Sequence, residues 1–148
     1  MPEPVITLIS GVAAIVTNVW RVSKELYDII EGIRNAPEHV RIIMADVEGL
    51  YIVLGALQGL LPNVNARRLR ADLVPIFESL QTNLGNCCSS LIEFSRKLIR
   101  YTNAAGQISK SKWMAFRWQF TEKDVKEYRD HLTAYKMTVQ LAISTANL

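Results

Sequence analysis

Hydrophobic residues recur every three or four positions along most of the chain, and this spacing predicts four long α-helices. The first runs from Val5 to Ile33 and ends at Asn35-Ala36-Pro37, because proline forces the residue before it out of the helical region. The second starts at Pro37 and ends at the turn Pro62–Asn65, where Asn65 is a candidate N-cap for the third helix. The third runs from about Ala66 to Tyr101.

The fourth helix is expected to begin at Thr121, since Thr121 and Asp124 form an approximate capping box. Pro75 predicts either a kink in the third helix or its true start, and Asn103–Lys112 predicts a loop that contains Gly106. No segment shows the sustained alternation of a β-strand. The pattern therefore predicts an all-α fold, an antiparallel four-helix bundle with a short extra helix or aromatic clasp before the last helix. Residues 1–148 form a single domain in this interpretation.

Each helix carries an apolar stripe that predicts its core face. The first stripe contains Val5, Leu8, Val12, Ile15, Val19, Val22, Leu26, Ile29 and Ile33. The second contains Val40, Ile43, Val47, Leu50, Leu54, Leu57 and Leu61. The third contains Leu73, Ile76, Leu80, Leu84, Cys87, Leu91, Phe94, Leu98 and Tyr101. The fourth contains Val125, Tyr128, Leu132, Tyr135, Val139, Ala142 and Ala146.

The first helix also has a second apolar stripe that a bundle does not require. No charged residue occurs between Val5 and Trp20, and a helix that is apolar all round lies either in a core or in a membrane. The second stripe contains Ile6, Ile9, Ala13, Val16 and Trp20. The uncharged run is about two residues shorter than a usual spanning helix, so a constitutive transmembrane segment is not expected. Glu3 precedes the run without any Lys or Arg, which argues against a secretory signal.

The remaining chemistry of the chain does not point to an active site. His39 and His131 lie on different predicted helices, and neither has a carboxylate or cysteine at a matching spacing. Cys87 and Cys88 are adjacent and cannot easily bridge each other, which favours a reducing, intracellular setting. Cys87 falls on the core stripe, whereas Cys88 lies off it and is a candidate for exposure. We therefore expect no catalytic residue, no metal, no cofactor and no enzymatic activity.

Basic and aromatic residues alternate within one short segment before the last helix. Its members are Lys110, Lys112, Trp113, Phe116, Arg117 and Trp118. The segment fits an aromatic clasp that packs across the bundle, which we favour, or an amphipathic contact with a membrane–water interface. Stacking on single-stranded nucleic acid is a third interpretation, but a net charge of +3 is too weak to support it, and no nucleic-acid partner is expected.

The basic surplus continues around this segment, from Arg96 to Lys126, where only Glu122 and Asp124 oppose it. It fits a solvated face, or attraction to an acidic membrane worth about 1 kcal/mol per residue near the surface.

Several stretches in order along the chain resemble one family. They are EPVITLISGVAAIV, RNAPEHVRII, EGLYIVLGAL, the long helix with the two cysteines, and SKWMAFRWQFTEKDVKEYRDHL. Together they are similar to the HeLo-like N-terminal domain of fungal NOD-like receptor (STAND) proteins. The likeness covers nearly the whole chain, and its most specific parts are Asn35-Ala36-Pro37 and Lys112 to Trp118.

The resemblance implies an effector module that executes programmed cell death, in heterokaryon incompatibility or an innate-immunity-like response. It would oligomerise and move from the cytoplasm to the membrane, where its first helix inserts. The implied insertion residues are Val5, Ile6, Leu8, Ile9, Val12, Ile15, Val16, Val19 and Trp20. The implied partners are anionic membrane lipids on activation, other copies of the chain, and C-terminal nucleotide-binding and repeat domains or a separate receptor. The alternative is a soluble homotypic interaction or adaptor domain, in which the first helix is simply the central core element.

Overall fold

The structure is a computed structural model that describes residues 2–64 and 74–146, and within these ranges it contains five α-helices and no strand. The elements are α1 (Pro2–Glu31), α2 (Glu38–Leu60), the 3-10 turn η1 (Leu61–Asn63), α3 (Val74–Arg100), α4 (Lys110–Gln119) and α5 (Glu122–Ala146). The all-α prediction is confirmed, and so is the short extra helix before the last one.

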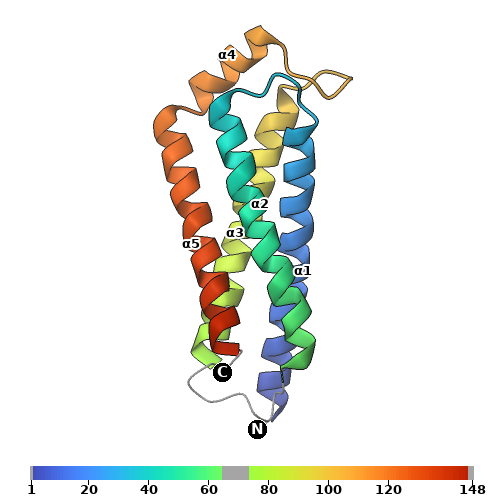
Figure 1. The fold of residues 1–148 in the computed structure, drawn as a ribbon, viewed down its shortest axis with the longest axis vertical. Helices are drawn as coiled ribbons and strands as arrows, with labels where there is room; N and C mark the ends of the chain where they lie inside the picture. The colour runs from blue at the N-terminus through green and yellow to red at the C-terminus, as the bar shows by residue number, and fades with distance from the viewer. Residues whose placement is uncertain (1, 65–73, 147–148) are drawn as a thin grey trace.

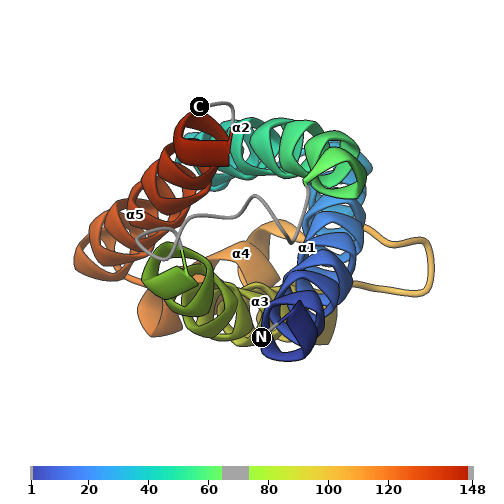
Figure 2. The same cartoon turned by 90° about the horizontal axis from the view of Figure 1, so that it is seen from below.

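Four long helices form the bundle, and α4 crosses one of its ends (Figure 1). α1 packs between α2 and α3, and α5 packs against the same two helices on the opposite side (Figure 2). Each long helix runs opposite to the one before it in the chain. Because α1 and α5 are diagonal, the ring also contains two parallel neighbours, α1 beside α3 and α2 beside α5. Both termini lie at the end of the bundle away from α4.

The predicted core stripes of α2, α3 and α5 are largely confirmed. Every member of the α2 stripe is buried. α3 buries its predicted stripe from Leu80 to Leu98, with Phe77 as an addition, while Ile76 and Tyr101 are only half-buried. Tyr135 is likewise half-buried on α5. Leu73, Asn65 and the predicted start of the third helix at Ala66 lie outside the described residues, as does the side chain of Ala146.

The core stripe of α1 differs from the predicted one. Its buried aliphatic positions are Val12, Val16, Val19, Val22, Leu26 and Ile30, continued by Ile33 just past the helix end. Ile15 and Ile29, which the prediction placed in the core, are only half-buried. A straight helix has 3.6 residues per turn, so a stripe that repeats every 3.5 drifts around it. The stripe that faces the core therefore takes Val16 from the second predicted stripe and replaces Ile29 by Ile30.

Polar side chains fix the turns at the α4 end of the bundle. Gln107 donates its Nε2–H to the Gly32 carbonyl at 2.7 Å and accepts the Arg34 backbone N–H at 2.8 Å, which joins the α1–α2 turn to the α3–α4 loop. Gly106 has a φ of +76°, a conformation that glycine adopts without a steric cost. The predicted loop ends at Ser109, three residues early, because the Ser109 Oγ accepts the Lys112 N–H and caps α4.

The predicted capping box at α5 is confirmed. The Thr121 N–H donates to Asp124 Oδ2 at 2.9 Å, and the Asp124 N–H donates to Thr121 Oγ1 at 3.3 Å. The Thr121 N–H and the Thr121 hydroxyl both donate to the Asp124 carboxylate, and these two bonds lower the pKa of Asp124. The prediction that α2 starts at Pro37 is wrong by one residue. Pro37 directly precedes α2 as its N-cap residue, and the helix begins at Glu38.

Candidate functional site

The inner side of α4 forms an aromatic clasp over the end of the bundle. Trp113 and Phe116 are buried, and Phe120 follows them directly after the helix. Phe116 packs edge-on against Phe94 of α3 with 6.3 Å between ring centroids, and Phe120 lies 5.2 Å from the same ring. Tyr128 of α5 stacks on Phe94 at 4.9 Å, so one cluster joins α3, α4 and α5. The favoured clasp interpretation is therefore confirmed for Trp113 and Phe116.

The outer side of α4 faces solvent and carries most of the rest of the segment. Trp118 is 83% exposed and Met114 is 60% exposed. Lys110, Lys112 and Arg117 are also exposed, and α4 contains no acidic residue. We call Lys110, Met114, Arg117 and Trp118 the α4 outer face, while Lys112 is exposed on the other side of the buried stripe because residues two positions apart do not share a helix face. The six predicted interface residues are thus not brought together on one side of α4, because Trp113 and Phe116 are buried and the other four are exposed.

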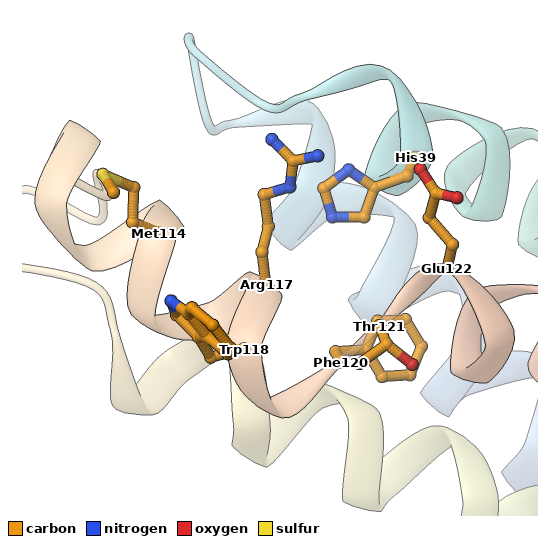
Figure 3. Close-up of a pocket in the computed structure, with 7 residues that line it drawn as sticks. All are labelled: His39, Met114, Arg117, Trp118, Phe120, Thr121 and Glu122. Carbon is orange, nitrogen blue, oxygen red and sulfur yellow. The ribbon is translucent and has the colours of Figure 1, made fainter.

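A groove of about 430 Å³ adjoins this face on the side of α2 and α5 (Figure 3). Its lining residues are His39, Met114, Arg117, Trp118, Phe120, Thr121 and Glu122. Figure 3 shows the Arg117 side chain extending toward His39, with Trp118 and Met114 farther along α4. Burial lowers the pKa of His39, Arg117 lowers it further, and Glu122 partly opposes the shift.

The groove lacks the partners that catalysis by His39 would require. Its Nε2 atom is buried and has no hydrogen-bond partner among the described residues. Within residues 2–64 and 74–146, no three His, Cys, Asp or Glu side chains lie close enough together to hold a metal ion. His131 lies on a different surface, where it borders a separate hollow between α3 and α5. The groove can offer a cation and apolar surface to a ligand.

The predicted insertion residues of α1 are not brought together on one surface. Val12, Val16 and Val19 are fully buried, whereas Ile6 is 51% exposed. The intermediate, half-buried members are Leu8, Ile9, Ile15 and Trp20. The side chain of Val5 lies outside the described residues. Among the described insertion residues, Ile6 in the first turns of α1 is therefore the exposed one.

The second stripe of α1 has a structural explanation, which is that it faces α2. The Trp20 ring lies over Gly55, where the indole Nε1 would be 3.4 Å from an added Cβ. Gln58 donates its Nε2–H to Thr17 Oγ1 at 3.1 Å. Toward the N-terminus, α1 and α2 diverge into a groove of about 380 Å³ lined by Ile9 and Ala13 on one side and Leu61 on the other. A helix that packs on two neighbours needs an apolar arc wider than one stripe.

Both cysteines are buried, so Cys88, which was a candidate for exposure because it lies off the core stripe, is not exposed. Cys88 faces α1, where Asn18 donates its Nδ2–H to Cys88 Sγ at 3.5 Å. Cys87 points into the core, and burial raises the pKa of its thiol to about 12. Burial also raises the pKa of Cys88, with Arg21 opposing the shift. Neither thiol is activated, because a reactive cysteine needs a lowered pKa and access to solvent.

Comparison with known proteins gives one family match. The model of the family described as "Pigment biosynthesis cluster protein PigL N-terminal" matches residues 3–148. It covers nearly the whole chain and is consistent with a fungal helical domain, while it names neither a HeLo-like domain nor a NOD-like receptor. No curated protein and no solved structure matches the chain.

Proposed function

We propose, from the premise that the chain belongs to the family of pigment biosynthesis cluster protein PigL N-terminal domains, that it is a non-enzymatic effector domain acting on membranes through α1. In the fungal setting that the HeLo-like resemblance implies, copies of the domain oligomerise at an acidic membrane and permeabilise it, and this executes cell death. The words "N-terminal" in the family's description suit a module that is followed by other domains.

The observation that carries this proposal is the composition of α1 together with its incomplete burial. Within the described residues, the segment Ile6–Glu31 is the helix that is long and apolar enough to cross a membrane. Only 28% of its most apolar 18-residue window is buried.

Insertion of α1 requires it to leave the bundle. The first turns, with Ile6, Leu8 and Ile9, can contact lipid while the fold persists, but they are too short to cross a hydrocarbon core of about 30 Å. Crossing it also needs Val12 to Trp20. The six buried aliphatic side chains of α1 contribute on the order of 10 kcal/mol to the fold, which is comparable to the whole stability of a domain. Lipid contact and association with other copies must offset this cost together.

Substitution of Ile6 tests the proposal without disturbing the core. Ile6→Asp should lower the leakage of acidic vesicles at least about tenfold, because a carboxylate near the end of an inserting helix is costly in lipid. Ile52→Asp on α2 is the matched control, since Ile52 is 56% exposed and Ile6 is 51% exposed. We expect this control to leak as the wild type does. Equal leakage by the two variants would overturn insertion through α1.

The alternative adaptor function is favoured by the complete burial of Val12, Val16 and Val19. A domain of that kind keeps α1 in its core at all times and associates with its partners in solution. Flotation on the same acidic vesicles separates the two functions. Protein that stays out of the lipid fraction, while still self-associating, would establish the adaptor and exclude the effector.

A further inference from the structure

We infer that the α4 outer face is a docking surface for an anionic lipid bilayer, used by the folded bundle before α1 moves. The inference deepens the proposed function, on which it rests only for the choice of a membrane as partner. It assigns the first contact with lipid to Trp118, Met114 and the cations around them, at the end of the bundle away from the N-terminus (Figure 1).

Trp118 has no packing role in the fold. It is 83% exposed, whereas Trp113 on the same helix is 7% exposed and belongs to the aromatic clasp. Indole is the side chain most typical of the membrane–water interface, where its ring lies at the depth of the headgroups. Met114, 60% exposed and one turn earlier, adds a flexible apolar contact beside it.

The α4 outer face also carries positive charge. Lys110 and Arg117 are exposed beside Met114 and Trp118 on α4, and no acid on this helix offsets them. The acids that follow, Glu122 and Asp124, belong to α5, and the Asp124 carboxylate already accepts bonds from the N-cap Thr121. A helix that joins exposed cations to an exposed tryptophan is the pattern of an interfacial helix on anionic lipid.

The aromatic clasp holds the α4 outer face rigidly. Trp113 packs edge-on against Phe116 at 5.6 Å, and Phe116 packs against Tyr101 at 5.7 Å. The inner side of α4 is therefore fixed to the bundle, and the outer side is presented without any rearrangement. Docking exposes no core residue, so it occurs at a much lower cost than the release of α1.

A lipid surface fits this face better than the other polyanions do. Stacking on single-stranded nucleic acid uses successive aromatic rings along a cationic groove, but only Trp118 of the α4 aromatics is exposed. The groove beside it, with Arg117 and His39, has room for one phosphate headgroup under a bilayer that contacts Trp118.

The test uses two double variants of the full chain. Their binding is measured by co-sedimentation with phosphatidylcholine vesicles, with and without phosphatidylserine. Met114→Ser with Trp118→Ser should weaken binding to the acidic vesicles by about tenfold or more. Lys110→Gln with Arg117→Gln should weaken it by about 25-fold at low salt, since each cation contributes about fivefold. Met137→Ser is the matched control, because Met137 is 63% exposed on α5 and should have no effect.

The outcomes distinguish docking from insertion. Unchanged binding of the Met114/Trp118 variant, equal binding to neutral vesicles, or no binding of the wild type would each overturn the docking surface. If the wild type causes leakage and the α4 variants bind vesicles as it does, the proposed function stands and only the docking surface is overturned. If binding depends on α4 and no leakage occurs, the docking surface stands and the proposed function is overturned. Binding that free inorganic phosphate abolishes at constant ionic strength would assign the cations to a phosphate site and overturn a bilayer as the ligand.

Discussion

At the scale of single residues, His39 links the pH to the stability of the α4 end. Its imidazole lies between Arg117 and Glu122, and burial followed by Arg117 lowers its pKa from the ordinary value of 6.5. The unfolded chain therefore binds a proton at a higher pH than the folded chain does. Stability should fall as the pH drops below about 6.5, until the lowered pKa of the folded state is passed.

Urea unfolding at a series of pH values checks this prediction. His39→Gln should remove the part of the pH dependence that lies between the two pKa values of His39, because the side chain no longer titrates. His131→Gln, at an exposed position on α5, is the control and should retain it. A pH dependence that survives in the His39 variant would show that another group is responsible.

At the scale of helices, the contact between Asn18 and Cys88 reports whether α1 stays in the bundle. Both thiols are buried and burial raises the pKa of each, so alkylation near neutral pH should be slow in solution. If α1 leaves on acidic vesicles, Cys88 loses its cover first, whereas Cys87 stays among α3 and α5. We expect faster labelling of the Cys87→Ala variant than of the Cys88→Ala variant, only with acidic lipid. Leakage without faster labelling of Cys88 would mean that α1 remains against α3.

The helices also show what sequence periodicity can and cannot predict. The α2 stripe was predicted in full, since one helix face is enough to describe its core contacts. In α1 the choice between Ile29 and Ile30 depends on how the helix is rotated between two neighbours, which no local pattern specifies. The same limit applies to α4. Trp113 and Trp118 are five residues apart and lie on different sides, and only the position of the bundle decides which one is buried.

At the scale of the whole molecule, the two surfaces assigned to membranes lie at opposite ends. A helix of 30 residues is about 45 Å long, so docking through α4 holds the first turns of α1 far from the bilayer. Recruitment and insertion must then be successive, because the first turns reach lipid only after α1 leaves the bundle or after the molecule turns over. This order explains why the outer face of α4 and the start of α1 can both be apolar without either being redundant.

Fluorophores at the two ends test the order of these events. Thr7→Cys and Ser111→Cys place reactive thiols at exposed positions on α1 and α4, and the native cysteines are buried. On vesicles with a quencher in the lipid, the label at position 111 should be quenched as soon as the protein binds. The label at position 7 should be quenched only later, with the same time course as leakage. Quenching at position 7 before position 111 would show that the bundle approaches the membrane with its termini first, and that α4 faces away from the lipid.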